Sequence, residues 1–575
     1  MAPHRVADVL VDTLVSVGVQ RVYGVAGDSL NGITDSIRPR KDISWVHVRH
    51  EEAAGFAAGA EAQLTGRLAV CAGSCGPGNL HLINGLFDAH RSRAPVLAIA
   101  AQIPSPEIGG GYFQETHPDQ LFRECSHFAE LVTQPEQIPR ILEIAIRTAV
   151  AREGVAVIAI PGDVALRKAA SGSAGLSLPD PHRRVGPSEA DVSRLVELLS
   201  TPQKVTILAG AGCADAHGPL IALAQRLQAP IVHTLRGKAH VEYANPCDVG
   251  MTGLLGFASG YHAIQAADVL LMLGTDFPYR QFYPSDAKLV QIDIRGEQIG
   301  RRAPVTLGVV ADVGLTLEVL LNLVPAQEDG RHLQSALADY TKSREGLDAL
   351  ATEGSSGAKV HPQYVAKVLD ELAAPDAVFA CDVGTPTVWA ARYLTMNGQR
   401  RLLGSFAHGS MANALPQAIG AQLTLPGRQV ISMSGDGGLA MLLGELLTLH
   451  QLDLPVKVVV FKNDSLAFVS LEMMASGFLN FATDLKNPDF AALANAAGVL
   501  GISVTTPDQV RPALARALQH PGPALVEVSV DRQELVLPPS IDLEQVRQFG
   551  LFVVKAVLNG RGDEVVDLAK TSWWR

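Results

Sequence analysis

An internal repeat constrains the fold of this chain of 575 residues more than any other feature. Residues 62–67 and 421–428 both begin Ala-Gln-Leu-Thr, and each leads through an apolar run into a glycine cluster, Gly76-Pro-Gly78 in the first copy and Asp436-Gly-Gly438 in the second. A helical stretch, a proline and another apolar run follow in both copies, and Gly78 and Gly438 are 360 residues apart. Strands that alternate with helices require a parallel sheet covered on both faces. We therefore expect two similar α/β domains, one at each end of the chain.

Four more apolar runs lie between the two copies, and each ends near a glycine or an aspartate. This pattern is typical of a doubly wound sheet whose strand ends face a ligand crevice. The turn at Gly210-Ala-Gly212 lacks the third glycine of a dinucleotide fingerprint, so a nucleotide site and a plain turn between strand and helix both remain open there. The four runs are residues 205–208, 269–273, 289–292 and 309–310.

Two segments rich in Ser, Gly and Pro, residues 167–191 and 325–362, separate the middle region from the two copies of the repeat. The expected domains are residues 1–182, 183–335 and 336–530, followed by a helical C-terminal tail at 531–575. The predicted fold class is α/β, with three doubly wound parallel-sheet domains and this tail.

Composition excludes several classes of protein. The net charge of −11 leaves no basic surface for nucleic acid, and 18% charged residues against 47% apolar ones favour a globular chain over a disordered one. Asp8 and Asp12 interrupt the first apolar stretch, which excludes a signal peptide, and no apolar run reaches about 18 residues, so we expect a cytoplasmic protein. Six scattered cysteines predict buried free thiols rather than disulfides or a zinc site.

Polar side chains follow two neighbouring strands of the predicted C-terminal sheet. Ser434-Gly-Asp-Gly-Gly438 lies between an apolar run and a helix, where backbone N–H groups and the helix dipole favour a phosphate. Asn463 comes 27 residues after Asp436, at the end of the next apolar run. Hard oxygen ligands beside a phosphate site favour Mg²⁺ that bridges a diphosphate.

This arrangement resembles that of the thiamine-diphosphate enzymes, in which Gly-Asp-Gly is followed some 25–30 residues later by Asn-Asn. The resemblance implies that Asp436, Asn463 and the backbone carbonyl of Ser465 are the Mg²⁺ ligands, and that Gly437 and Gly438 approach the diphosphate. One residue departs from the family pattern: Lys462 stands where the first Asn is usual.

The same family uses a glutamate from its first domain. Glu51 precedes the helical run 53–63, and by itself a glutamate at the start of a helix is a partner of the helix dipole. The resemblance implies instead that Glu51 hydrogen-bonds the pyrimidine of thiamine diphosphate and promotes its ionisation. Because different domains hold the two halves of the cofactor, the family plan also implies a dimer or, as we expect, a homotetramer.

Within this family the chain most resembles the pyruvate oxidases, also called quinone-dependent pyruvate dehydrogenases, in segments 24–31, 74–84, 111–118 and 382–389. The resemblance implies oxidation of pyruvate to acetate and CO₂, with electrons passing from thiamine diphosphate through FAD to ubiquinone along a route lined by Phe113 and Phe468. Met411 would be the apolar wedge that bends the cofactor, although ordinary core packing also suits a methionine. The implied thiamine contacts are Gly409, Ser410, Met411, Leu466, Ala467, Phe468 and Val469, and the implied FAD contacts are Gly210, Gly212, Gly250, Met251, Thr252, Gly253, Leu254, Thr275, Asp276, Phe277, Tyr279, Asp293 and Asp312.

Three alternatives were compared with this function. Acetolactate synthase shares the domain plan and FAD, but its usual Trp is replaced here by Glu472. A simple decarboxylase leaves the C-terminal tail unexplained. Intact Glu51, Asp436 and Asn463 argue against an inactive scaffold.

The tail carries apolar residues at helical spacing over 543–559 and an amphipathic end over 561–575. A tail docked on the enzyme or at a subunit interface is one interpretation of this pattern. The resemblance implies another, in which the tail binds membrane lipid and brings the enzyme to the inner face of the cell membrane. The expected membrane contacts are Leu551, Phe552, Val565, Leu568, Trp573 and Trp574.

Overall fold

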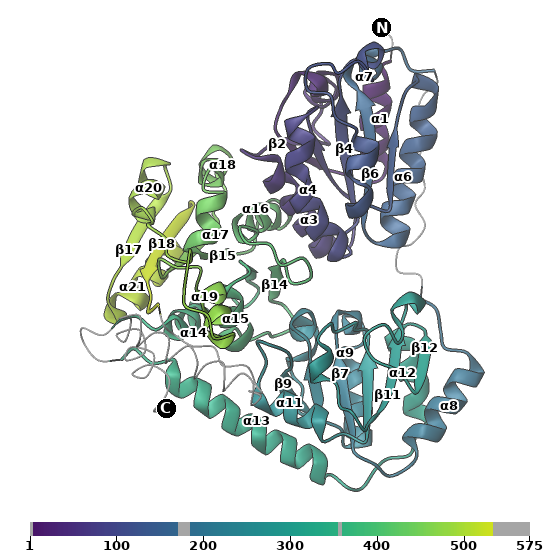
Figure 1. The fold of residues 1–575 in the computed structure, drawn as a ribbon, viewed down its shortest axis with the longest axis vertical. Helices are drawn as coiled ribbons and strands as arrows, with labels where there is room; N and C mark the ends of the chain where they lie inside the picture. Colours follow the sequence, from purple (N-terminus) through teal and green to yellow (C-terminus); the bar gives the residue numbers. More distant parts are fainter. Residues whose placement is uncertain (1–3, 171–183, 355–358, 533–575) are drawn as a thin grey trace.

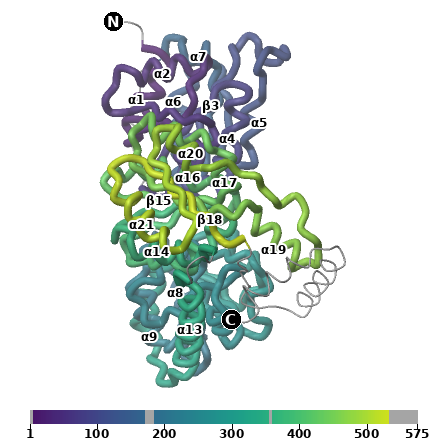
Figure 2. The backbone as a smooth tube through the Cα atoms, turned by 90° about the vertical axis from the view of Figure 1, so that its left-hand side faces the viewer, coloured from purple at the N-terminus to yellow at the C-terminus, as the bar shows by residue number. Residues whose placement is uncertain are grey.

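The computed structural model describes residues 4–170, 184–354 and 359–532, which form three α/β domains (Figure 1). Each domain has one six-stranded sheet in which every pair of neighbouring strands is parallel, with helices packed on the sheets. This confirms the predicted fold class of these residues. Figures 1 and 2 together show the C-terminal domain to one side of the other two, beside both of them.

The two terminal sheets have the same topology. The N-terminal order is β2-β1-β3-β4-β6-β5 and the C-terminal order is β14-β13-β15-β16-β18-β17, so each strand has a counterpart twelve strands later. The duplication predicted from the sequence is therefore confirmed. The N-terminal strands are β1 (Arg21–Gly24), β2 (Ser44–His47), β3 (Ala69–Gly73), β4 (Val96–Gln102), β5 (Phe128–Leu131) and β6 (Val155–Pro161), and the C-terminal strands are β13 (Val378–Cys381), β14 (Arg401–Gly404), β15 (Val430–Gly435), β16 (Lys457–Lys462), β17 (Leu500–Val504) and β18 (Ala524–Ser529).

The middle sheet has a different order, β12-β11-β10-β7-β8-β9. Its chain reversal lies between β7 and β10, as in other doubly wound sheets, where the diverging connections leave a crevice at the carboxyl ends of the strands. The strands are β7 (Val205–Ala209), β8 (Ile231–His233), β9 (Asp248–Met251), β10 (Val269–Leu273), β11 (Lys288–Asp293) and β12 (Leu307–Val310).

Helices connect the strands in all three domains. The boundary predicted between residues 335 and 336 falls inside helix α13 (Arg331–Leu350). The N-terminal helices are α1 (Val6–Ser16), α2 (Asn31–Ile37), α3 (Glu51–Thr65), α4 (Pro77–Arg91), α5 (Pro118–Leu121), α6 (Ile138–Arg152) and α7 (Gly162–Leu166); those of the middle region are α8 (Glu189–Leu199), α9 (His217–Leu227), α10 (Lys238–Val241), α11 (Ala258–Gln265), α12 (Val313–Leu323) and α13; and the C-terminal ones are α14 (Pro362–Leu372), α15 (Thr385–Tyr393), α16 (Ala414–Thr424), α17 (Asp436–Met441), α18 (Glu445–Gln451), α19 (Ala467–Ala475), α20 (Phe490–Ala496) and α21 (Pro507–Gln519).

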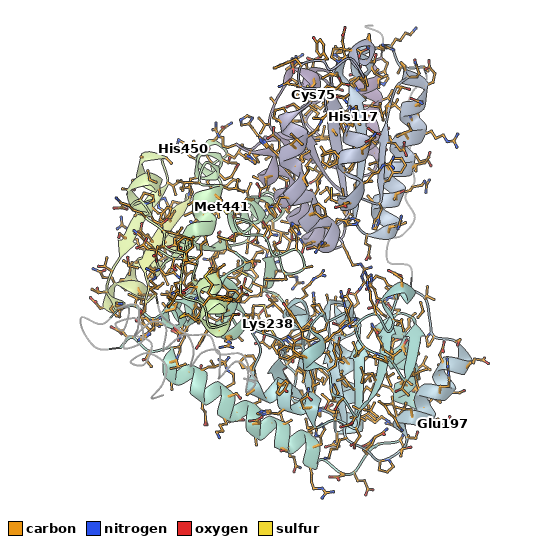
Figure 3. The ribbon with its side chains drawn as sticks, in the orientation of Figure 1. Cys75, His117, Glu197, Lys238, Met441 and His450 are labelled. Atoms are coloured by element: carbon orange, nitrogen blue, oxygen red, sulfur yellow. The ribbon has the colours of Figure 1, made fainter. Side chains whose placement is uncertain are left out.

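The central strands are buried on both faces. In β4, Leu97 and Ile99 belong to one hydrophobic cluster, whereas Ala98 and Ala100 belong to another on the opposite face. Such strands carry continuous apolar sequence because helices cover both sides of the sheet. The six cysteines are free and buried, as predicted, and Cys75 is seen in the N-terminal domain in Figure 3.

Helices α3, α4 and α16 bring the two terminal domains together. A Cβ atom on Gly420 of α16 would lie 2.2 Å from the carbonyl oxygen of Ala57 on α3, and one on Gly55 of α3 would lie 2.9 Å from Gly85 of α4. Glycine at these positions therefore permits the close approach of the helices. Buried Gln417 of α16 also donates to Asp88 of α4 at 3.1 Å, which fixes the pairing of the two domains. Among the described helices, none is long and apolar enough to span a membrane.

Candidate active site

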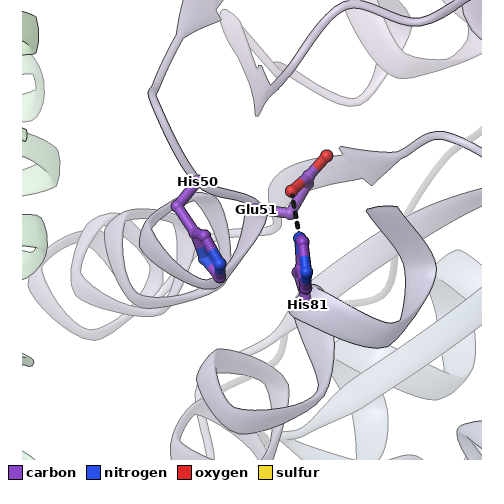
Figure 4. A group of neighbouring side chains, drawn as sticks. All are labelled: His50, Glu51 and His81. Carbon is purple, nitrogen blue, oxygen red and sulfur yellow. Dashed lines mark hydrogen bonds and ion pairs between the residues drawn. The ribbon is translucent and has the colours of Figure 1, made fainter. Parts of the chain in front are cut away.

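Glu51 is the first residue of α3 and is buried. The preceding residue, His50, has extended backbone and caps the helix, because its ring accepts a hydrogen bond from the backbone N–H of Glu52 at 3.2 Å. The Glu51 Oε2 atom lies 3.0 Å from Nδ1 of His81, on α4 (Figure 4). A Cβ on Gly78 would lie 3.0 Å from the other carboxylate oxygen of Glu51, so the glycine turn leaves room beside this carboxylate.

The C-terminal domain holds the chain just before Glu51. Buried Glu445, at the start of α18, accepts hydrogen bonds from the backbone N–H groups of Arg49 and His50 at 3.0 and 3.1 Å. Burial raises the pKa of Glu445, while the hydroxyl of Thr448 and these two N–H groups stabilise its anion. The sequence contains no local signal for Glu445, because its two hydrogen bonds join segments almost 400 residues apart.

Asn84 links the start of α3 to a loop of the C-terminal domain. It lies one turn after His81 on α4, and its amide donates to Glu52 at 2.7 Å and to the hydroxyl of Ser410 at 2.8 Å. Its amide oxygen accepts from Nε2 of His408 at 2.8 Å. The loop that we expect to contact thiamine is therefore hydrogen-bonded to the helix that carries His81.

Asp436 and Asn463 lie together at the carboxyl ends of β15 and β16, where the sequence predicted them. Oδ2 of buried Asp436 accepts from the backbone N–H groups of Asn463 and Asp464 at 3.0 and 2.6 Å, and from the amide of Asn487 at 3.0 Å. Burial raises the pKa of Asp436 against the effect of these hydrogen bonds. The carboxylate of Asp436 and the amide oxygen of Asn463 are hard oxygen donors, and this donor chemistry fits Mg²⁺. Asn487 has no counterpart in the predicted site.

Asp382 lies beneath both expected cofactor loops. Its side chain, buried after strand β13, accepts from the backbone N–H of Ala414 at 2.9 Å and from that of Gly435 at 3.2 Å. A Cβ on Gly438 would lie 2.4 Å from Asp382 Oδ2, so only glycine fits there without a shift. Burial raises the pKa of Asp382 to about 7. Asp382 belongs to segment 382–389, which resembles the pyruvate oxidases, but its spacing in the sequence does not indicate this bridging position.

Lys462, the residue that departs from the family pattern, forms an ion pair with buried Glu527. Its Nζ lies 3.0 Å from Glu527 Oε1 and donates to the carbonyl of Pro488 at 3.2 Å. The other oxygen of Glu527 accepts from the backbone N–H groups of Phe490 and Ala491, at the start of α20. The lysine therefore stabilises the C-terminal domain beside the glycine loop.

Apolar side chains surround the glycine loop. A Cβ on Gly437 would lie 3.1 Å from Leu466 and 3.4 Å from the methyl group of Met411, so these two side chains lie over the loop. Gly409, two residues before Met411, has a φ of +84°, a conformation that favours glycine. The role of Met411 as a wedge against the cofactor stays a prediction. Ala467, Phe468 and Val469 form the first turn of α19.

Phe113 and Phe468 lie in different surroundings. Phe113 is 78% exposed on a loop that packs against the glycine turn before α4: a Cβ on Gly76 would lie 2.9 Å from the Cβ of Gln114. Phe468 is partly buried against the C-terminal core. The loop places Phe113 on the same side of the N-terminal sheet as the glycine turn.

The middle domain presents buried oxygens at the carboxyl ends of its strands. Within the described residues, Asp293 Oδ2 and Thr252 Oγ1 have no hydrogen-bond partner, although both side chains are buried. Buried polar atoms are normally paired, so these two fit a bound polar ligand such as the ribose or ribityl part of FAD. Asp293 Oδ1 accepts from the backbone N–H of Arg295 at 2.9 Å. Gly250 and Gly253 have φ of +86° and +99° in the same region.

Other expected FAD residues have structural roles. A Cβ on Gly210 would lie 2.5 Å from the carbonyl oxygen of Gly274, and one on Gly212 would lie 2.6 Å from its Cα. These glycines allow the turns after β7 and β10 to pack together, as in the plain-turn interpretation. Asp312 caps α12 by accepting from Leu315 N–H at 2.8 Å. The expected membrane contacts, from Leu551 to Trp574, lie outside the described residues.

Comparison with known proteins identifies three matching regions. The family models described as thiamine pyrophosphate enzyme N-terminal TPP binding domain, central domain and C-terminal TPP binding domain match residues 4–121, 192–320 and 382–528, respectively.

Relatives of different names match nearly the whole chain. A putative thiamine pyrophosphate-containing protein, YdaP, of Bacillus subtilis is 36% identical over 99% of both chains. The pyruvate oxidase of Lactiplantibacillus plantarum is 30% identical over 91% of this chain and 88% of its own. The acetolactate synthase large subunit of Parasynechococcus marenigrum is 32% identical over 93% of this chain and 90% of its own. The identities to the pyruvate oxidase, 30%, and to the acetolactate synthase, 32%, differ too little to separate the two activities.

Proposed function

Because the chain belongs to the thiamine pyrophosphate enzyme family, we propose that it oxidises pyruvate to acetate and CO₂, with thiamine diphosphate, Mg²⁺ and FAD as cofactors and ubiquinone as electron acceptor. Thiamine diphosphate supplies an electron sink for decarboxylation and FAD supplies a two-electron acceptor. The protein would hold the two cofactors close together, exclude water from them and transfer protons to and from thiamine diphosphate.

The position of α19 is the observation that carries this proposal. The helix starts at Ala467, directly after the segment that lies over the glycine loop, and Glu472 lies in its second turn. The pKa of Tyr279, in the middle domain, is raised by burial and by the carboxylate of Glu472. Because Tyr279 belongs to the segment where we expect FAD, the influence of Glu472 on it indicates that the second turn of α19 lies near the expected flavin site. Such proximity suits electron transfer between the two cofactors.

A second contact supports the same pairing of domains. Arg392, on α15, donates to the carbonyl oxygens of Leu255 and Gly256 at 3.0 and 3.2 Å. These carbonyls directly follow the expected FAD segment 250–254. The C-terminal domain is therefore hydrogen-bonded to the edge of the crevice that would hold the flavin.

The residues of the chain have distinct roles in this function. Glu51 would hold a proton at the pyrimidine of thiamine diphosphate, and Asp436, Asn463 and the Ser465 carbonyl would hold Mg²⁺. Met411 and Leu466 would orient the cofactor from its apolar side. Phe113 and Phe468 would line the route between the cofactors.

Acetolactate synthesis is the second candidate, because a relative with that name matches the chain as well as the pyruvate oxidase does. Glu472 argues against it. In the synthases a tryptophan at this position selects the second substrate, and a carboxylate offers neither its shape nor its apolar surface.

Product analysis separates the candidates. The purified enzyme is supplied with thiamine diphosphate, Mg²⁺, FAD, pyruvate and a ubiquinone analogue, and acetate, acetolactate and acetaldehyde are measured. We expect acetate in equal amount to reduced quinone. Acetolactate without quinone reduction would identify a synthase, and acetaldehyde a simple decarboxylase.

We also propose that the enzyme is a homotetramer bound to the inner face of the cell membrane through its C-terminal tail. Exposed apolar side chains on α4, α17 and α18, such as Leu80, Met441 and Leu447, suit burial against a second subunit. Analytical ultracentrifugation tests the tetramer.

Deletion of residues 551–575 tests the role of the tail. It should abolish pyruvate-dependent binding to liposomes while reduction of a soluble dye continues; a truncated enzyme that still sediments with liposomes would contradict the role of the tail.

A further inference from the structure

His81 lies between the carboxylate of Glu51 and solvent. The Glu51 side chain is 9% exposed, whereas that of His81, whose Nδ1 lies 3.0 Å from Glu51 Oε2, is 45% exposed. Figure 4 shows the His81 ring directly below the carboxylate, on the neighbouring helix. A proton on Glu51 therefore has a direct hydrogen-bonded neighbour that reaches solvent.

The surroundings fix the orientation of the His81 ring. The ring of His50 stacks on it with 4.3 Å between centroids and 23° between planes, and His50 is itself held as the cap of α3. One turn along α4, Asn84 is bonded to Glu52 and Ser410, which fixes the helix against both domains. With Nδ1 directed at Glu51, the other ring nitrogen of the half-exposed His81 side chain can exchange a proton with water.

We propose that His81 is a positioning residue that relays protons between Glu51 and solvent. When Glu51 needs a proton, the Nδ1–H bond of His81 breaks as the Oε2–H bond forms, and Nε2 takes a proton from water, which is released as hydroxide. The imidazole stays neutral and changes tautomer, and the Glu51 hydroxyl then donates to Nδ1 through the same contact. The reverse transfer returns the proton to water, so the relay consumes no other reactant.

This inference rests on the proposed role of Glu51 toward the pyrimidine. A buried carboxylate that exchanges protons with a cofactor must restore its own protonation state, and without a relay that step depends on occasional entry of water. The relay should therefore set how fast Glu51 can promote ionisation of the cofactor, without changing how tightly the cofactor binds.

The test measures exchange of the C2 hydrogen of bound thiamine diphosphate for deuterium, without substrate, by rapid acid quench and NMR. In His81→Ala we expect exchange to be slower by about 10²-fold, the lower limit for general acid–base effects. Affinity for thiamine diphosphate, measured by fluorescence quenching, should change by less than about twofold, and added imidazole should restore much of the lost rate. His81→Asn, which keeps a hydrogen bond to Glu51 but cannot relay a proton, should show the same loss.

His50→Asn is the matched control, because asparagine is also a good helix cap and this change removes an imidazole that stacks on His81. We expect a much smaller loss there and no rescue by imidazole. Wild-type exchange in both His81 variants would overturn the relay, and so would a loss that imidazole does not restore in His81→Ala. Normal exchange in Glu51→Gln would instead contradict the proposed role of Glu51. Because no pyruvate or flavin is involved, failure of the relay is distinguishable from failure of the oxidase function.

Discussion

The two terminal domains share one strand order but differ at the glycine turn that follows equivalent strands. After β3, the turn carries no acid, and Gly78 leaves space for a carboxylate contributed by α3. After β15, the turn carries Asp436, whose oxygens accept hydrogen bonds from the backbone of its own turn, at Gly437, and of the turn after β16, at Asn463 and Asp464. A duplicated scaffold thus carries two different sets of groups: a carboxylate in one copy, which we propose transfers a proton, and oxygen donors in the other, which we propose bind Mg²⁺.

We expect the largest loss of activity from a substitution in the N-terminal domain, at Glu51. Glu51→Gln should lower the turnover of pyruvate by about 10²–10⁴-fold, because an amide cannot exchange a proton with the pyrimidine. Cofactor binding should change little, since the amide keeps the size of the side chain. Steady-state kinetics with a soluble dye measures the loss, and activity within twofold of wild type would reject this role.

Asp436→Ala should weaken Mg²⁺-dependent binding of thiamine diphosphate by more than about 100-fold. Loss of a residue that only hydrogen-bonds a metal ligand costs about 10–100-fold in metal affinity, and Asp436 is expected to be a direct ligand. Titration of the apoprotein with cofactor at fixed Mg²⁺ measures this change. Unchanged affinity and unchanged Mg²⁺ dependence would place the metal site elsewhere.

Asp382→Asn should weaken binding of thiamine diphosphate by about tenfold. The NH₂ group of the asparagine cannot accept a hydrogen bond, so one of the two backbone N–H groups loses its partner, at a cost of about 1–3 kcal/mol. It should also alter the pH dependence of stability. The pKa of Asp382 is raised to about 7 in the folded state from 3.8, so the native state holds this proton more tightly and loses stability as the pH rises from about 4 to 7.

The Asn variant removes this titration. Chemical denaturation at a series of pH values should show a flatter decline in stability over that range than the wild type shows. The same slope in both proteins would mean that Asp382 does not hold its proton in this way.

Lys462→Asn should have the smallest effect on the cofactor. Because Lys462 is paired with Glu527 rather than directed at Asp436, we expect affinity for thiamine diphosphate to change less than about threefold. The free energy of unfolding should fall by about 1–3 kcal/mol, since Glu527 remains buried without its cation. Glu527→Gln provides the second arm of a double-mutant cycle. A large loss of affinity with unchanged stability would show that Lys462 contacts the diphosphate.

The sequence predicted those features that depend on local order along the chain. The repeat around Gly78 and Gly438 predicted two domains of one topology, because alternating strands and helices have few ways to pack. The spacing of Asp436 and Asn463 predicted their proximity, because neighbouring parallel strands end at the same edge of the sheet.

Contacts between distant segments could not be predicted in this way. Glu445 binds the backbone before Glu51, and Asn84 binds Ser410, only because α3, α4 and α16 pack closely at glycines. The partner of Lys462 was equally hidden, since Glu527 lies 65 residues later on the adjacent strand. No periodicity of the sequence marks such pairs.

The measurement that tests the proposed function most directly is the visible spectrum of the purified enzyme with all cofactors, under anaerobic conditions. If the two expected cofactor sites exchange electrons as proposed, addition of pyruvate should bleach the yellow flavin absorbance within a few turnovers, and added quinone should restore it. A yellow protein that consumes pyruvate and stays yellow would contradict the oxidase function and favour acetolactate synthesis.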